Sequence, residues 1–254
     1  MSDFTSDPWA KLRAATPARM ALGRAGVAVP TQASLAFQFA HARARDAVHS
    51  ALDVAALSRQ LQGHQVLHVQ SGAPSRAIYL RRPDLGRRLA EGQAEKLPFA
   101  PCDVLIIVAD GLSAMAVQTH ASGVIHALVP RLSGLRLGPV VIAQQARVAI
   151  GDEIGAKIGA RLCVLLVGER PGLTVADSLG AYLTFAPEPG IRDSARNCVS
   201  NIHDQSGLSH TQAAAKIAWL ARAALKLGLT GTGLKENAPQ IEGPEQTPSI
   251  HFSI

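Results

Sequence analysis

Three short stretches of this chain carry polar or glycine residues directly after an apolar run, which makes them candidates for ligand binding. They are Asp110-Gly111, residues 144–148, and Gly168-Glu169-Arg170-Pro171-Gly172. If the apolar runs are parallel strands, these stretches lie at their carboxyl ends, where open parallel sheets bind ligands. A carboxylate at Glu169 could there accept hydrogen bonds from amide or hydroxyl groups of a ligand.

The same residues also have ordinary structural interpretations. Glu169 could pair with Arg170 or with a nearby helix N-terminus. Asp110 could cap the helix that follows it, and Cys198 could be a small buried residue. Val148 has no polar side chain, so a ligand could meet only its backbone or its apolar surface. The residue types alone therefore leave the ligand open.

Familiar nucleotide-binding and catalytic signatures are missing from the sequence. No G-x-G-x-x-G follows a strand candidate, and residues 151–157 fail the spacing of a phosphate-binding P-loop. Neither H-E-x-x-H nor G-x-S-x-G occurs. The cysteines, Cys102, Cys163 and Cys198, form no Cys-x-x-Cys pair. The sequence predicts neither a set of catalytic residues nor a metal site.

The elements that must position these residues predict an α/β domain. Residues 103–109 are apolar without a break after Asp103, which is typical of a strand buried on both faces of a parallel sheet. Strands and helices then alternate, which predicts a doubly wound, Rossmann-like, mainly parallel sheet. The strand candidates are residues 66–69, 77–80, 103–109, 139–143, 162–167 and 182–185, and the helices cover about 113–128, 150–160 and 210–227.

Residues 1–62 predict a helical and irregular N-terminal extension. Asp7-Pro8-Trp9 is a helix start, and Thr31 caps a long helix whose apolar residues recur at roughly helical spacing. This extension is too thin to form a core of its own, so we expect it to pack on the main domain, residues 63–233, or on a partner. The tail, residues 234–254, is rich in Pro, Glu and Gln and is expected to be disordered.

Composition and charge narrow the class of protein. A hydrophobic content of 47% is ample for a buried core. The net charge is +6, but no block of five like charges occurs, so we expect a mildly basic surface and no nucleic-acid binding. No apolar run approaches the roughly 18 residues of a membrane span, and the N-terminus is unlike a signal peptide. We therefore expect a cytoplasmic protein that binds no membrane.

Several longer stretches resemble the small subunits of ethanolamine ammonia-lyase. The resemblance covers about residues 8–233, in order and with few gaps. Agreement of several long words in sequence is far more specific than any single short motif. The matching stretches are residues 22–26, 41–49, 79–89, 108–114, 154–155, 167–173 and 196–203.

The resemblance implies a non-autonomous subunit of a carbon–nitrogen lyase. In that family a large TIM-barrel subunit pairs with a small subunit, the pairs form a higher-order assembly, and adenosylcobalamin lies between the two subunits. The cofactor carries the radical chemistry that turns ethanolamine into acetaldehyde and ammonia. The D-x-H-x-x-G motif of another cobalamin-binding fold is missing here, which fits base-on binding.

The resemblance also assigns three cobalamin contacts to this chain: Val148, Glu169 and Cys198. Val148 and Glu169 fall near expected strand exits, whereas Cys198 lies beyond the last strand candidate, so its place rests on the resemblance alone. A stand-alone cobalamin-binding or delivery protein of similar fold is the alternative. The number of subunit pairs and packaging in a bacterial microcompartment stay open.

Overall fold

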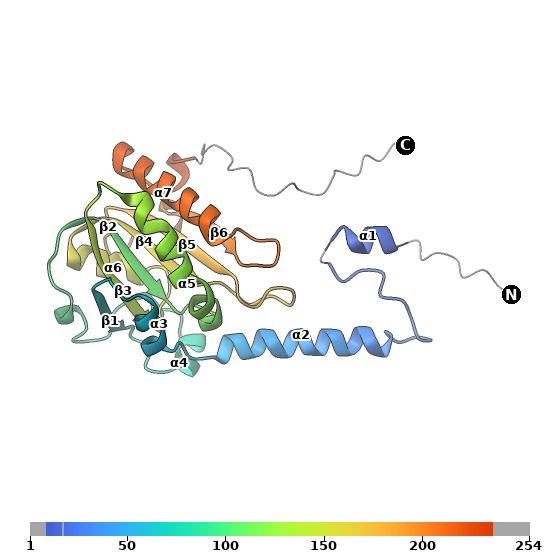
Figure 1. Cartoon of the computed structure of the whole chain (residues 1–254). Helices are drawn as coiled ribbons and strands as arrows, with labels where there is room; N and C mark the ends of the chain where they lie inside the picture. Colours follow the sequence, from blue (N-terminus) through green and yellow to red (C-terminus); the bar gives the residue numbers. More distant parts are fainter. Residues whose placement is uncertain (1–8, 17, 236–254) are drawn as a thin grey trace, which may run out of the picture.

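The computed structural model describes residues 9–16 and 18–235. They form an α/β fold around one six-stranded mixed sheet with the strand order β1-β3-β2-β4-β5-β6 (Figure 1). Neighbours among β1, β3, β2 and β4 pair in parallel, whereas β5 and β6 are added antiparallel. The prediction of a mainly parallel sheet is confirmed. The strands are β1 Val66–Gln70, β2 Cys102–Ala109, β3 Leu137–Gln144, β4 Ala160–Gly168, β5 Leu179–Phe185 and β6 Asn197–Ile202.

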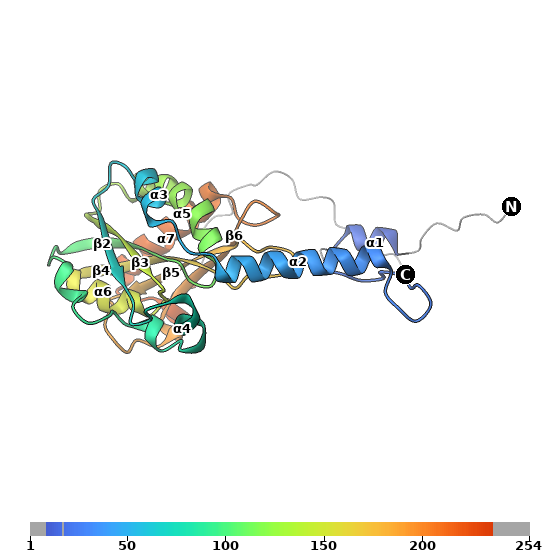
Figure 2. The same cartoon turned by 90° about the horizontal axis from the view of Figure 1, so that it is seen from below.

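Helices cover both faces of the sheet (Figure 2). The helices α3, α5 and α7 lie on one face and α6 lies on the other. Short 3-10 turns at Leu85–Arg87, Ala94–Lys96, Val129–Leu132, Asp193–Ala195 and Gly231–Gly233 join some of the elements. The α-helices are α1 Ala10–Ala14, α2 Thr31–His49, α3 Val54–Gln60, α4 Arg76–Arg81, α5 Ala114–Leu128, α6 Ile150–Ile158 and α7 His210–Leu227.

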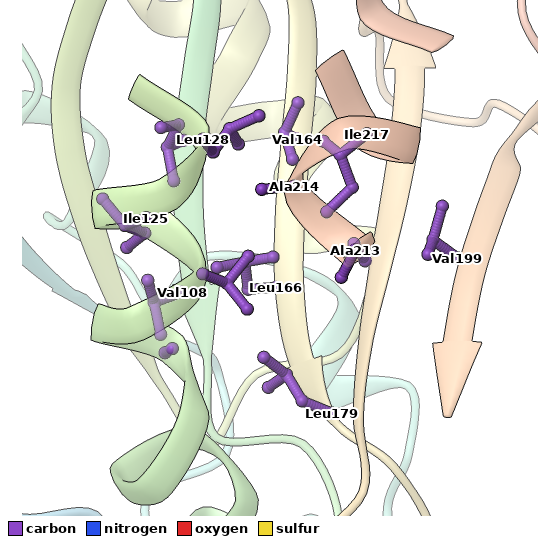
Figure 3. Packing of buried hydrophobic residues seen from close by; sticks show 14 of the residues in the cluster. Val108, Ile125, Leu128, Val164, Leu166, Leu179, Val199, Ala213, Ala214 and Ile217 are labelled. Atoms are coloured by element: carbon purple, nitrogen blue, oxygen red, sulfur yellow. The ribbon is translucent and has the colours of Figure 1, made fainter. Parts of the chain in front are cut away.

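The central strand β2 shows why the apolar run is continuous. Successive side chains of a strand point to opposite faces, and here both faces are covered. Val104, Ile106 and Val108 belong to the core beneath α5 and α7, whereas Leu105 and Ile107 belong to the core beneath α6. Figure 3 shows the first of these two cores, with side chains of α5, α7 and the strands packed together.

The helix ends follow local signals that the sequence displays. The Ser113 side chain accepts a hydrogen bond from the backbone N–H of Ala116 and so caps α5. Ser209 and Gln212 form a reciprocal capping box at the start of α7. Gly228 ends that helix in the left-handed conformation that glycine adopts without strain. The predicted bounds of α5 and α7 are confirmed.

Two predictions about the sheet were wrong. Residues 77–80 are not a strand but part of α4, because Ser75 caps a helix there by accepting from the N–H of Ile78. Four apolar residues in a row fit either structure. The strand β6 was not predicted at all, because as an edge strand it buries only Val199 and Ile202 and is otherwise polar. Cys198 therefore lies within the sheet rather than beyond it.

The N-terminal helices extend away from the sheet (Figures 1 and 2). The long helix was predicted to run from Gln32 to about Leu52 with Thr31 as its cap; α2 instead begins at Thr31, with Pro30 at the cap position and no side-chain cap, and ends at His49. Its buried residues are only Ala40 and Ala47, while Leu35, Phe37 and Phe39 are exposed. α2 thus presents apolar side chains that the described residues, 9–16 and 18–235, leave uncovered.

The next helix joins the body of the protein. Leu57 of α3 and the following Leu61 are fully buried in the core beneath α5. Asp7 and Pro8, predicted to start the first helix, lie outside the described residues, as does most of the predicted tail. None of the helices in the described part of the chain is long and apolar enough to cross a membrane.

Candidate functional site

A buried carboxylate organises the carboxyl edge of the sheet. Asp110 directly follows β2 and is 2% exposed. Its two carboxylate oxygens accept hydrogen bonds from the backbone N–H groups of Gln145 and Ala146, each at 2.9 Å. Gln145 has a positive φ of 52°, a conformation that non-glycine residues seldom adopt. Asp110 therefore clamps the loop after β3; the helix cap that its position suggested is supplied by Ser113 instead.

The surroundings of Asp110 shift the pKa of its carboxyl group in both directions. Burial raises the pKa of the Asp110 carboxyl, while the N–H groups of Ala146 and Gln145 and the nearby Arg76 act to lower it. Arg76 Nη1 lies 4.0 Å from Asp110 Oδ2 and donates to the carbonyl of Gly111 at 2.7 Å. The carboxylate is thus held by several partners in a place where water has been removed.

The clamped loop places Val148 at the start of α6. The backbone N–H of Arg147 donates to the carbonyl of Gly86 at 2.8 Å, and the Val148 carbonyl accepts from Gly151 at 3.1 Å. Val148 is half-buried and packs against the core beneath α6. Its backbone and side chain therefore have fixed positions at this edge, as a role in binding would require.

Polar atoms without partners gather around the same loop. The guanidinium groups of Arg76 and Arg147 lie over the Tyr79 ring, at 4.8 and 4.9 Å from its centroid. Arg76 Nη2, Arg147 Nε and Gln145 Oε1 are buried, and none of them has a hydrogen-bond partner within residues 9–16 and 18–235. The part of the edge around this loop is therefore its most polar interior, with three atoms that the described residues leave unsatisfied.

Glu169 follows β4 at the same edge and is half-buried. Its Oε2 accepts a hydrogen bond from the Ser178 hydroxyl at 2.6 Å, and its backbone N–H donates to the Ser178 carbonyl at 2.9 Å. The side chain lies over Gly180, where a Cβ atom would come within 2.8 Å of Oε1. Ser178 and Gly180, rather than Arg170 or a helix N-terminus, thus determine where this carboxylate sits.

Cys198 lies on β6, which the strand β5 separates from β4 and from Glu169 at its end. It is exposed and pairs in register with Tyr182 of β5, with which its thiol shares a hydrogen bond. Burial, followed by the contact with Cys198 and the negative charge of Glu169, raises the pKa of Tyr182 to about 12. Although much of the Cys198 residue is exposed, loss of water around its sulfur and the Glu169 charge raise the pKa of the thiol, which is therefore neutral at pH 7.

A buried ion pair joins α6 to the strands of this cluster. Arg196, just before β6, donates to both carboxylate oxygens of Asp152 on α6, at 2.6 and 2.7 Å. Arg196 also donates to the Thr184 hydroxyl of β5 at 2.7 Å. Both charged side chains are almost fully buried. The pair therefore connects the helix that begins beside Val148 with the strand that carries Cys198.

Glu169 and Cys198 both lie near enough to Tyr182 to raise its pKa, and Val148 follows β3 at the carboxyl edge of the sheet. Cys198 itself lies near the start of β6, level with Leu165 in the middle of β4 and not at that edge. Tyr182 and Val148 pack against the same apolar core, beneath α6. Sequence reasoning missed a set of supporting residues, whose contacts join positions far apart in the chain and leave no local motif. This set is Arg76, Tyr79, Asp152, Ser178, Gly180 and Tyr182.

The fold and the candidate site define an α/β protein with a six-stranded, mostly parallel sheet that presents polar and apolar groups at its carboxyl edge. The model of the ethanolamine ammonia-lyase light chain family (EutC) matches residues 6–235. The ethanolamine ammonia-lyase small subunit of Bradyrhizobium diazoefficiens is 53% identical over 239 residues, covering 91% of each chain. That of Azotobacter vinelandii is 50% identical over 247 residues, covering 93% of this chain and 91% of the relative.

These similarities extend over nearly the whole described chain. The protein belongs to the family of ethanolamine ammonia-lyase small subunits, and its enzymatic class is that of a carbon–nitrogen lyase subunit. The resemblance seen in the sequence is confirmed, and it favours a subunit over a stand-alone delivery protein.

Proposed function

We propose that this chain forms one wall of an adenosylcobalamin site that the large subunit of ethanolamine ammonia-lyase completes. Val148, Glu169 and Cys198 are the proposed cofactor contacts. When bound, adenosylcobalamin supplies the radical chemistry by which ethanolamine becomes acetaldehyde and ammonia. The observation that carries this proposal is the Glu169 carboxylate, held by Ser178 over Gly180 beside an exposed strand position.

The residues present at the edge fit the chemistry of the cofactor. The rim of a corrin bears amide side chains, which both donate and accept hydrogen bonds. Glu169 Oε1 can accept from an amide N–H, because Ser178 binds the other oxygen, Oε2. Val148 and the neutral thiol of Cys198 offer apolar contact to the macrocycle. These side chains bind and orient, and we assign them no step of bond making or breaking.

The partner surface is proposed to include α2. Leu35, Phe37 and Phe39 are 57%, 47% and 66% exposed on this helix. A group of large exposed apolar side chains on one element is typical of an interaction surface. We assign this surface, within the extension of residues 1–62, to the large subunit or to a neighbouring pair in a higher-order assembly.

Further parts of the proposal concern the cofactor's state and the location of the enzyme. Base-on binding is proposed because the sequence lacks D-x-H-x-x-G, the motif with which another fold supplies a histidine ligand. A cytoplasmic location, with a bacterial microcompartment as its special case, is supported by the three cysteines, all of them free. The Rossmann-like domain of residues 63–233 would carry the cofactor contacts.

Replacement of Glu169 tests the cofactor site. In the complex of this chain with the large subunit, Glu169→Ala is expected to weaken cobalamin binding by about 1–3 kcal/mol, the usual cost of losing a charged hydrogen bond. The dissociation constant should therefore rise roughly 5- to 150-fold when measured by equilibrium dialysis. Glu188→Ala, which removes an exposed carboxylate beyond β5, is the matched control. An unchanged dissociation constant for Glu169→Ala would remove this residue from the site.

A further inference from the structure

A second cluster of polar side chains that could bind a ligand lies between α5 and α7, on the face of the sheet that these two helices cover. We propose that His120, Asp204 and His210 bind a divalent transition-metal ion of the zinc type. His120 is fully buried in α5, and His210 is the first residue of α7. Asp204 is exposed in the loop that joins β6 to α7. Three separate elements thus converge on one point.

The donor atoms are close enough to share one ion. His120 Nδ1 lies 3.0 Å from His210 Nε2, and one ligand atom from each of the three residues lies within 4.8 Å of the others. Donors bound tetrahedrally to zinc at about 2.1 Å are roughly 3.4 Å apart. The exposed Asp204 side chain can rotate to close the remaining gap. Two imidazoles and a carboxylate are a ligand set that suits zinc and its first-row neighbours.

The second nitrogen of His120 supports a role as ligand. A metal-binding histidine generally donates its other ring N–H to a carboxylate, which fixes the ring and its tautomer. His120 Nε2 faces Asp177 Oδ2 at 3.9 Å. Nε2 and Asp177 Oδ1 are both buried and, within the described part of the chain, have no hydrogen-bond partner. A metal on Nδ1 would leave the proton on Nε2, pointing toward Asp177.

A glycine of α5 makes room for the second histidine of the cluster. Gly123 has no side chain, and a Cβ there would overlap the His210 ring. The small residue lets the two helices bring their histidines together.

Two features act against the ion. The N-terminal dipole of α7 disfavours a cation, but the nearby carboxylates of Asp204 and Asp177 oppose this effect. The two imidazoles also lie within hydrogen-bond distance of each other, and a metal would replace that hydrogen bond with two coordinate bonds. The hydrogen bond alone does not account for the convergence of Asp204 on the same two nitrogens, whereas a shared ion does.

Metal binding can be measured directly on the complex of this chain with the large subunit. After treatment with a chelator and desalting, the complex is titrated with Zn²⁺ in the presence of a chromophoric competitor, and bound zinc is counted by elemental analysis. The variants are His210→Ala, which removes a partly exposed ligand, and Asp177→Asn, which keeps the shape of the supporting carboxylate. The control is His126→Ala, an exposed histidine on the same helix, α5.

The expected result is one more tightly bound Zn²⁺ per small chain in the wild-type and His126→Ala complexes than in the His210→Ala complex. Asp177→Asn should weaken zinc binding roughly 10- to 100-fold, the usual effect of removing a carboxylate behind a ligand. Bound Co²⁺ should show visible ligand-field bands that His210→Ala abolishes. Equal zinc content in wild type and His210→Ala, or no zinc in the wild type, would overturn the proposal. Cobalamin affinity is measured on the same samples, so failure here and failure at Glu169 are distinguishable.

Discussion

The ion pair between Arg196 and Asp152 makes a sharp prediction about stability. In the wild type the two carboxylate oxygens of Asp152 lie 2.6 and 2.7 Å from guanidinium nitrogens of Arg196. Asp152→Asn keeps the size of the side chain but removes its negative charge and one of these two acceptors. Breaking a buried pair costs about 3–5 kcal/mol, because the remaining charge loses its compensation away from water. Arg196 keeps its bonds to the Thr184 hydroxyl and the Ile191 carbonyl, so we expect the lower end, about 3 kcal/mol.

This loss of stability should be visible as a lower melting temperature. For a protein of this size, 1 kcal/mol corresponds to about 2–4 °C, so Asp152→Asn should lower Tm by roughly 6–12 °C in thermal unfolding followed by circular dichroism. The control is Asp84→Asn. Its ion pair with Arg82 has a similar N–O distance of 2.7 Å, but the two side chains are 60% and 54% exposed.

The comparison isolates the effect of burial, since both pairs are bidentate. Asp84→Asn should leave Tm unchanged, because exposed pairs contribute little. A Tm change for Asp152→Asn as small as that of the control would refute the reasoning. The double replacement Asp152→Leu with Arg196→Met should recover much of the loss, because an apolar pair of similar volume needs no compensation.

Two further predictions concern positions outside this pair. Gly168→Ala should destabilise the protein by about 3 kcal/mol in urea denaturation, because the new Cβ would overlap the backbone carbonyl of Ser113; a loss under about 1 kcal/mol would contradict this. Asp103 accepts a hydrogen bond from the backbone N–H of Arg136 and pairs with Arg161, and both contacts lower the pKa of its carboxyl. Its contribution to the stability of the folded protein is therefore fully present above about pH 4 and is lost as the pH falls through the folded-state pKa. Asp103→Asn should flatten the dependence of Tm on pH in that acidic range, and an unchanged slope would show that Asp103 is not responsible.

The central part of the fold could be predicted from the sequence because burial leaves a direct trace there. Residues 104–109 of β2 and 162–167 of β4 have side chains buried on both faces of the sheet, so these runs are apolar without interruption. The caps Ser113 and Ser209 act on residues three positions away, which a local pattern can reveal. The edge strand β6 was missed for the opposite reason, since only Val199 and Ile202 of that strand are buried.

The site was predictable only in part. The position of Glu169 at a strand exit follows from the order of the elements along the chain. Its real partners do not, because Ser178 and Gly180 are brought to it by an antiparallel strand whose pairing no short pattern specifies. Asp110 shows the same limit: its bonds reach Gln145 and Ala146, across a helix and a strand of intervening sequence.

Because Asp110 holds the loop that carries Val148, the conformational entropy of this loop is lost during folding and not during ligand binding. The loop that carries Val148 becomes ordered when the chain folds, because Asp110 binds two of its N–H groups in the interior. A ligand arriving at this edge therefore meets a rigid surface and need not order the loop itself. Ordering flexible side chains costs about 0.5–1.5 kcal/mol each in a typical interface. Here that entropy is lost once, during folding, and the affinity for each incoming molecule is correspondingly higher.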